Sequence, residues 1–267
     1  MNLAICSLAS GSSGNCYLVY SKSAAVLVDA GISGRQIFSK LEALGLKPDQ
    51  ISALMVTHEH SDHIKGLAQA AKKTGAKIYA SRGTSREFPD ELRERTEILS
   101  AGDSLRIEDM KIKCFSISHD AAEPLAYSFF SGDKQISIVT DTGVLTEEIL
   151  KNIEASDILV LESNHDENIL RMGRYPWFLK QRILSEHGHL SNEGAARGLL
   201  ELLRMDRDQG SARKRQVLLA HLSKENNFPE MALTTVKNVL EEEGFYQGKH
   251  YQVNILSRSE ASPVYWI

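Results

Sequence analysis

The sequence predicts an α/β protein, because apolar runs typical of buried strands alternate with amphipathic helical patterns along the whole chain. No linker interrupts this alternation, so a single domain over residues 1–267 is expected. The clearest strand-like runs are 25–28, 53–56, 136–139, 158–161 and 217–220.

Helical patterns lie between these runs and have recognisable ends, since glycine terminates helices and serine or proline begins them. The expected helices are 34–44, a segment from Ile64 to Gly75, one that Ser191 caps, and one from Pro229 to Gly244, before a strand over 251–256.

Composition sets limits on location and partners. The formal net charge of −4 gives no general attraction to nucleic acid, so a phosphate-bearing partner would be held by local charge or by metal. The opening lacks a basic leader, and no apolar run reaches the roughly 20 residues that a bilayer requires. We therefore expect a cytoplasmic protein without a membrane anchor. Cys6, Cys16 and Cys114 are expected to be buried thiols, because their spacing fits no zinc ribbon or disulfide framework.

The two halves of the chain echo each other. Val28-Asp-Ala-Gly31 precedes a second strand and the polar cluster HEHSDH, while Thr140-Asp-Thr-Gly143 precedes a second strand and Ser163-Asn-His-Asp166. This order predicts two similar half-domains whose polar strand ends meet at one edge, unless the similarity of two buried strand pairs is accidental.

The segment Met55–Ile64, MVTHEHSDHI, places three histidines and two acidic residues directly after a strand. His58 and His60 are two apart on an extended chain and so point the same way, whereas Asp62 and His63 begin the next helix. Imidazole and carboxylate groups in one small volume predict a site for zinc, manganese or iron. The alternative is a solvated helix start that is rich in histidine.

At these residues the sequence resembles the metallo-β-lactamase superfamily, whose H-x-H-x-D-H motif it contains. Four further positions are similar to motif residues of that superfamily: Asp29 in LVDAG, His119 in SHDAAEP, Asp141 in IVTDTG and His221 in VLLAHLS. The resemblance implies a four-layer αββα sandwich with two divalent metal ions at one rim. It assigns His58, His60 and His119 to one ion. Asp62, His63 and His221 then hold the other, Asp141 bridges both, and Asp29 supports the cluster from behind.

Such a centre implies metal-assisted hydrolysis, in which Asp62 also orients the attacking hydroxide. In the phosphodiesterase branch of the superfamily, a histidine in a setting similar to His189-Leu-Ser191 contacts the scissile phosphate and protonates the leaving oxygen. His189 is therefore the candidate acid and His187 a substitute for it, with a polar turn before a capped helix as the alternative.

Other candidate substrate-binding residues lie between positions 165 and 182. His165 echoes the metal motif and would either position substrate or make a supporting hydrogen bond. The segment 171–182 mixes cations with aromatic residues, as nucleic-acid-binding segments do, which makes Arg171, Arg174 and Trp177 candidates. A packed helix start with solvated arginines would have the same composition.

The short gaps between motifs leave no room for the tRNA-gripping arm or the inserted nuclease domain of other branches. The chain resembles the YycJ (WalJ) family in the segments SLASGSSGNCYLV, THEHSDH, SNHDENIL, GHLSNEGAA and AHLSKENN. This resemblance implies a DNA 5′-to-3′ exonuclease that acts on duplex ends and takes part in mismatch repair. Whether the chain forms a homo-oligomer cannot be read from it.

Two other functions remain open on the sequence. One is a phosphodiesterase for small molecules or RNA with the same metals; the other is a non-catalytic module that binds nucleic acid. Asp62, His63 and Asp141 are all present, which argues against the second, because degenerate members commonly lose some of these ligands. Lactamase and thioesterase activities are weaker alternatives, since neither would use the His-Leu-Ser turn.

Overall fold

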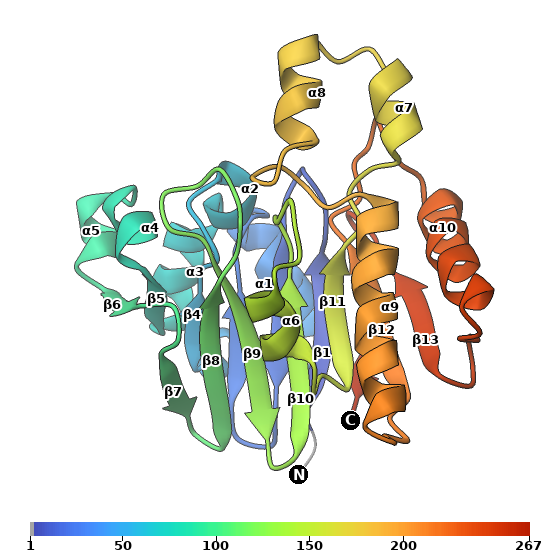
Figure 1. The fold of residues 1–267 in the computed structure, drawn as a ribbon. Coiled ribbons are helices and arrows are strands. Elements are labelled where there is room, and N and C mark those ends of the chain that lie inside the picture. Colours follow the sequence, from blue (N-terminus) through green and yellow to red (C-terminus); the bar gives the residue numbers. More distant parts are fainter. Residues whose placement is uncertain (1–2) are drawn as a thin grey trace. The chain divides into compact units, whose positions relative to one another are not determined.

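The computed structural model describes residues 3–267, whose strands form two seven-stranded sheets (Figure 1). The first has the order β14-β1-β2-β3-β4-β5-β6 and the second β13-β12-β11-β10-β9-β8-β7. The strands are β1 (Ala4–Ala9), β2 (Cys16–Tyr20), β3 (Ala25–Val28), β4 (Ala53–Met55), β5 (Lys77–Ser81), β6 (Thr96–Leu99), β7 (Ser104–Ile107), β8 (Met110–Ser116), β9 (Leu125–Ser131), β10 (Lys134–Val139), β11 (Ile158–Glu162), β12 (Arg215–Ala220), β13 (Tyr251–Ile255) and β14 (Tyr265–Trp266).

The helices alternate with these strands, as the sequence predicts. They are α1 (Gly34–Ala43), the 3-10 helix η1 (Pro48–Gln50), α2 (Ser61–Ile64), α3 (Leu67–Thr74), α4 (Arg82–Arg86), α5 (Asp90–Arg93), α6 (Glu147–Ile153), α7 (Glu167–Met172), α8 (Trp177–Ile183), α9 (Asn192–Asp208) and α10 (Pro229–Glu242). None of the helices within residues 3–267 is long and apolar enough to cross a bilayer.

Backbone contacts divide the chain into two compact units. Unit 1 comprises Met1–Ser116, Ala121–Ile136 and Ser257–Ile267, and unit 2 comprises Ile117–Asp120 and Ser137–Leu256. The single domain over residues 1–267 stays a prediction. The two units are described separately below.

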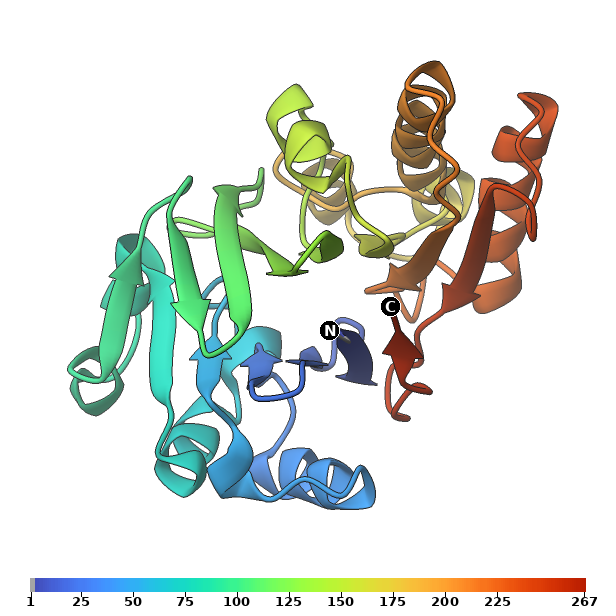
Figure 2. The same cartoon turned by 90° about the horizontal axis from the view of Figure 1, so that it is seen from below.

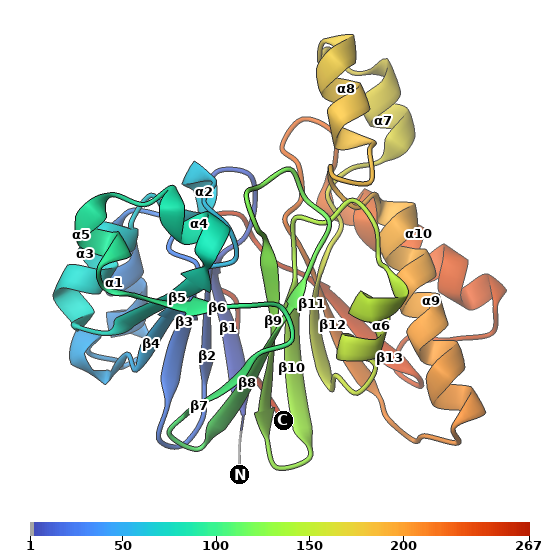
Figure 3. The same cartoon turned by 60° about the vertical axis from the view of Figure 1, so that its left-hand side comes forward.

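In unit 1, β3, β4, β5 and β6 are parallel and the strands before them antiparallel. The helices α1 and α3 bury their apolar stripes against this sheet, through residues such as Ile37, Leu41 and Leu67. Figure 3 shows these helices on one side of the sheet. The antiparallel strands β7, β8 and β9 belong to the same unit, and Tyr127 of β9 donates a 2.6 Å hydrogen bond to the carbonyl oxygen of Val56.

In unit 2, β11, β12 and β13 are parallel. The long helices α9 and α10 pack together beside them, over a core that includes Leu199, Val217 and Val236. Figure 2 shows these two helices on one side of the strands. Ser191 caps α9 by accepting a hydrogen bond from the backbone of Gly194, which confirms the predicted helix start.

One predicted helix is wrong in detail. The pattern from Ile64 to Gly75 is two helices, α2 and α3, because Gly66 interrupts it. A Cβ atom at Gly66 would lie 2.2 Å from the carbonyl oxygen of Ile32, so the backbone approaches its neighbour too closely for any side chain. Hydrophobic spacing does not reveal such a close approach, because the residues on both sides keep the same periodicity.

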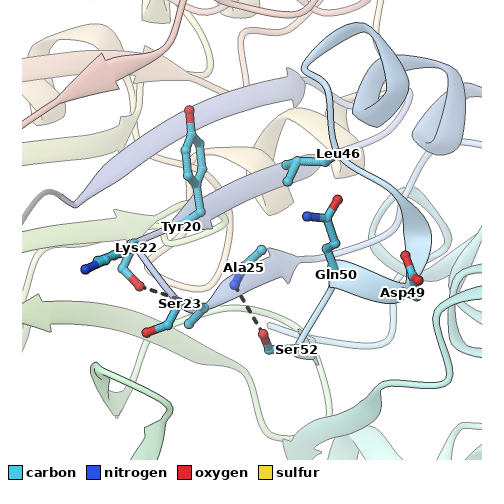
Figure 4. A pocket seen from close by; sticks show the side chains of 10 residues that line it. Tyr20, Lys22, Ser23, Ala25, Leu46, Asp49, Gln50 and Ser52 are labelled. Atoms are coloured by element: carbon cyan, nitrogen blue, oxygen red, sulfur yellow. Dashed lines mark hydrogen bonds between the residues drawn. The ribbon is translucent and has the colours of Figure 1, made fainter.

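A pocket of about 340 Å³ in unit 1 lies at the start of β3 and before β4 (Figure 4). Tyr20, Lys22 and Gln50 line it, and the backbone N–H of Ala25 donates to the hydroxyl of Ser52 beside it. The motif H-x-H-x-D-H follows the opposite end of β4, so this pocket is not where the predicted hydrolytic residues lie.

Candidate active site

In unit 1 the histidines of the motif come together just beyond β4. The chain remains extended after this strand, and His60 is the N-cap residue of α2. The ring centroid of His58 lies 4.6 Å from that of His60 and 4.0 Å from that of His63. The predicted convergence of these three side chains is therefore present.

Asp29 holds two of these imidazoles in place, directly and through Thr57. The Nδ1–H of His63 donates to Oδ2 of Asp29 over 2.8 Å. Thr57 donates its backbone N–H and its hydroxyl to the same carboxylate, so the Thr57 oxygen is left to accept from Nδ1 of His58 at 3.0 Å. Both imidazoles thus carry their proton on Nδ1, and the lone pair lies on Nε2, the form that binds a metal ion.

Asp62 is positioned through its backbone. A Cβ atom on Gly31 would lie 1.7 Å from the Asp62 carbonyl oxygen, which also accepts a 2.8 Å hydrogen bond from the backbone of Asn15. The Asp-x-Gly turn after β3 therefore presses against α2, and only glycine fits at its third position. The Asp62 carboxylate is partly exposed and lies 3.6 Å from Nε2 of His63.

In unit 2 a second cluster surrounds Glu162, the last residue of β11. One ligand-capable atom from each of four residues lies within 4.8 Å of the others: Asp141, Glu162, His189 and His221. The fully buried Glu162 carboxylate accepts 2.8 Å hydrogen bonds from Nδ1 of both His189 and His221. It also accepts from the backbone N–H groups of Thr142 and Leu190.

These contacts keep Glu162 ionised. Burial alone would raise the pKa of its carboxyl, but the charge of His189 and the hydrogen bonds from His189 and His221 hold that pKa at about 2. Burial lowers the pKa of His189, while the negative charge of Glu162, their hydrogen bond and the charge of Asp141 raise it above the ordinary value. Each residue therefore stabilises the charged form of the other.

His119 is oriented in the same way as the other histidines. Its Nδ1–H donates to the carbonyl oxygen of Gly188 over 3.1 Å, and its ring centroid lies 5.2 Å from that of His189. Burial lowers the pKa of His119 more than the charge of Asp141 raises it, which favours the neutral imidazole. Four histidines predicted as ligands thus donate Nδ1–H to a fixed acceptor, which is the tautomer that suits a metal ion.

Three of these residues have left-handed backbone conformations that are rare outside glycine. Asp29, Asp141 and His221 have φ values of 60°, 58° and 55°. Each lies just after the end of a strand, where the chain changes direction. Backbone strain of this kind, about 1–3 kcal/mol per residue, is typical of functional positions.

The remaining candidates differ in environment. His187 is exposed and bonds the hydroxyl of Ser118 over 3.0 Å, while His165 is buried. Neither ring nitrogen of His165 has a hydrogen-bond partner within residues 3–267. Arg171 and Trp177 are exposed on α7 and α8, and Arg174 is exposed between them.

Sequence reasoning missed Glu162. It follows the buried run Ile158–Leu161 directly, and a carboxylate at the end of a buried strand was a usable signal. Asp29, directly after β3, performs the same task, since both carboxylates accept a histidine Nδ1–H and a backbone N–H.

The family model of the β-lactamase superfamily domain matches residues 24–221. Exodeoxyribonuclease YycJ of Bacillus anthracis is 38% identical over 258 residues, which cover 95% of each chain. Exodeoxyribonuclease WalJ of Streptococcus pneumoniae strain D39 is 38% identical over 263 residues, 96% of this chain and 95% of the relative. The chain belongs to the β-lactamase superfamily, in the family of YycJ and WalJ.

The fold agrees with this membership in the YycJ and WalJ family. The metallo-β-lactamase fold protein YhfI of Bacillus subtilis superposes with a TM-score of 0.70 and 18% identity, over 98% of both chains. The αββα sandwich expected from the sequence is thereby confirmed, as is the class of enzyme, a hydrolase of a metal-dependent family.

Proposed function

We propose that this chain is a metal-dependent exodeoxyribonuclease that degrades DNA from the 5′ end. The observation that carries the proposal is the 38% identity over 95% of both chains to a protein named as an exodeoxyribonuclease. The cluster around Glu162 supports it, because a histidine whose Nδ1–H is bonded to a carboxylate, beside ligand-capable side chains, suits the cleavage of a phosphodiester.

The proposed ligands are those that the resemblance assigns. In this set His58, His60 and His119 would hold one divalent ion, Asp62, His63 and His221 would hold a second, and Asp141 would contribute to both. The fixed Nδ1 hydrogen bonds of His58, His63, His119 and His221 support this set, since they place the lone pair of each imidazole on Nε2. Zinc, manganese and iron all suit these nitrogen and oxygen donors.

When bound, such ions lower the pKa of a water molecule toward neutrality and neutralise charge on the scissile phosphate. Side chains of the protein orient the attacking oxygen and supply the proton. Asp62 orients the attacking oxygen, and its partly exposed carboxylate is accessible for that task. His189 delivers the proton from Nε2 to the oxygen that leaves phosphorus, while Glu162 keeps Nδ1 protonated and the ring in place.

The sequence alternatives make different predictions. A phosphodiesterase for small molecules or RNA would use the same ligands and the same acid, and would act well on short diesters. A non-catalytic module would not need the control of histidine tautomers that the three histidine hydrogen bonds to Asp29 and Glu162 provide. A role in DNA repair, a cytoplasmic location and a preference for duplex ends stay predictions.

The test is degradation of a DNA duplex labelled at one 5′ end. Protein stripped of metal is refilled with manganese or with zinc and compared with Asp62→Ala. Stepwise loss of the 5′ label that requires both metal and Asp62 is the expected result. An intact duplex together with rapid hydrolysis of a simple phosphodiester would replace the proposal with the small-diester function.

A further inference from the structure

The hairpin formed by α7 and α8, residues 167–183, carries an unusual apolar surface. Met172, Phe178 and Trp177 have exposed fractions of 81%, 74% and 67%, and they are the three most exposed large apolar side chains within residues 3–267. Figures 1 and 3 show both helices standing away from the strands of unit 2. Monomeric proteins seldom expose such a group of side chains without a binding role.

The hairpin holds these side chains out rigidly. Asp166 caps α7, and the buried Lys180 of α8 donates a 2.7 Å hydrogen bond from Nζ to the backbone oxygen of Arg171 at the end of α7. Gly173, in the turn, lies so close to Asn226 that a Cβ atom would be 3.0 Å from the amide oxygen. The two short helices are therefore fixed to each other and to the loop after β12.

The hairpin is locally basic on an acidic chain. Residues 167–183 contain four cationic side chains and one acidic side chain, although the whole chain has a net charge of −4. Arg171 pairs with Glu167 over 3.2 Å, and Arg182 pairs with Asp120. Arg174 is exposed and makes no ion pair with any residue from 3 to 267.

Both ends of the hairpin lead into the cluster around Glu162. Glu162 is connected to the start of α7 by a short polar segment, and His189 follows the end of α8 after one turn. The pairing of Arg182 with Asp120 also ties α8 to the residue beside His119. A ligand on the hairpin would thus bind to a segment that is joined at both ends to the side chains proposed for hydrolysis.

We propose that this hairpin is a platform for unpaired nucleotides of the DNA substrate, on which bases stack against Trp177 and Phe178 and a phosphate contacts Arg174. The inference rests on the proposed nuclease function and adds the substrate class, single-stranded DNA or a duplex with an unpaired end. Aromatic side chains beside cations are how proteins bind single strands without sequence preference. A second copy of the chain fits less well, because two hairpins of the same charge would repel each other.

The chain offers a direct probe, because it contains two tryptophans. Trp266→Phe leaves Trp177 as the single indole, so its fluorescence reports base stacking. The probe is a phosphorothioate oligothymidylate, which resists hydrolysis, with a blunt duplex of the same length for comparison. Saturable quenching by the oligothymidylate, and little by the duplex, is the expected result.

Affinity gives a second measurement. Trp177→Ala and Phe178→Ala should each weaken binding of the oligothymidylate by roughly tenfold, since base stacking contributes about 1–3 kcal/mol per base. The matched control is Trp266→Ala, which removes the other tryptophan, 56% exposed in unit 1, and should leave binding unchanged. Truncation of such exposed side chains should leave the fold intact.

Three results would overturn the platform. These are unquenched Trp177 fluorescence, equal loss of affinity in Trp266→Ala, or a dimer in wild-type protein that Trp177→Ala converts to monomer. Degradation of the 5′-labelled DNA by the wild-type protein separates the two proposals, because it reports cleavage and not where the strand is bound. If the DNA is degraded and the platform fails, the nuclease proposal stands alone; if the DNA stays intact, the proposed function fails as well, whether or not bis(p-nitrophenyl) phosphate is hydrolysed.

Discussion

Glu162 controls two histidines at once, so it is the residue whose charge matters most in unit 2. Glu162→Gln keeps the size of the side chain but replaces an acceptor oxygen with an amide nitrogen, which would face an N–H donor. We expect turnover or metal affinity to fall by about 10- to 100-fold, the usual effect of losing a carboxylate behind a metal-binding histidine.

Metal content and the pH profile of turnover should be measured on the same samples of Glu162→Gln. If His189 loses its proton at a lower pH in Glu162→Gln than in the wild type, Glu162 is a positioning residue. Unchanged metal content together with an unchanged pH profile would contradict this role. Glu167→Gln is a suitable control, because its partly exposed carboxylate pairs with Arg171 on the surface of α7.

His189→Ala separates the acid from the metal ligands. Since the proposed acid lies outside the ligand set, the variant should keep nearly normal metal content while kcat falls by about 10²- to 10⁴-fold. Metal analysis and single-turnover kinetics measure the two quantities independently. Loss of metal together with turnover would show that His189 is a ligand, an assignment that its position within 4.8 Å of Asp141 and His221 also allows.

We predict that the stability of the fold decreases at acidic pH because of His165. Burial lowers its pKa to about 4, below the ordinary value of 6.5, although the charge of Glu162 raises it. Between those two pH values the unfolded state binds a proton that the native state does not, so stability is present above pH 6.5 and falls as the pH drops toward 4.

The slope from this one group is about 1.4 kcal/mol per pH unit within that window. Urea unfolding of the wild type and of His165→Gln at pH 7 and pH 5 tests it. The variant should lose less stability between the two pH values than the wild type does. Equal losses would mean that His165 is already protonated or hydrogen-bonded in the native state.

At the scale of the elements, both halves of the chain contain an Asp-x-Gly turn at the end of a strand. After β10, a Cβ atom on Gly143 would lie 2.3 Å from the backbone oxygen of Ser185 and 2.4 Å from that of Glu186. The turn therefore supports the loop that carries His189, as the turn at Gly31 supports α2. In each half, a strand end fixes the position of the next functional segment by backbone contact.

Gly143→Ala should displace that loop. Overpacking against backbone atoms costs about 1–3 kcal/mol, so we expect lower stability and a fall in kcat as His189 moves. Thermal unfolding and steady-state kinetics measure the two effects. The control is Gly210→Ala, where φ is +65° and no atom lies within 4 Å of the added Cβ, so only the cost of the left-handed conformation, about 1–2 kcal/mol, applies.

The elements also show how far the sequence could predict the site. The histidines near β4 were found because local spacing places them together, two apart on an extended chain and then at a helix start. Glu162 was missed because its partners His189 and His221 are distant in sequence and meet it only through the fold. The break at Gly66 was missed for the same reason, since the carbonyl that forbids a side chain belongs to Ile32.

At the scale of the whole molecule, each unit contains a buried carboxylate that organises histidines, Asp29 in unit 1 and Glu162 in unit 2. Buried charges of this kind are stable only when hydrogen-bonded, and in both units the donors are imidazoles that would otherwise titrate near neutral pH. Without a bound cation, these clusters concentrate lone pairs and carboxylate charge. A metal ion should therefore contribute to the stability of the fold as well as to hydrolysis.

Removal of metal should accordingly lower the melting temperature. An ion present at 100 times its Kd stabilises the native state by about 2.7 kcal/mol, which corresponds to a shift of roughly 5–10 °C for a chain of this size. Differential scanning calorimetry before and after chelation, with manganese or zinc restored, measures this shift in melting temperature.

Because Asp141 is a proposed ligand of both ions, Asp141→Asn should melt at nearly the same temperature with and without metal. His189→Ala should retain the full shift, since its role is to donate a proton. If chelation removes the metal from the wild-type protein without changing its melting temperature, the ions contribute to hydrolysis alone and not to the stability of the fold.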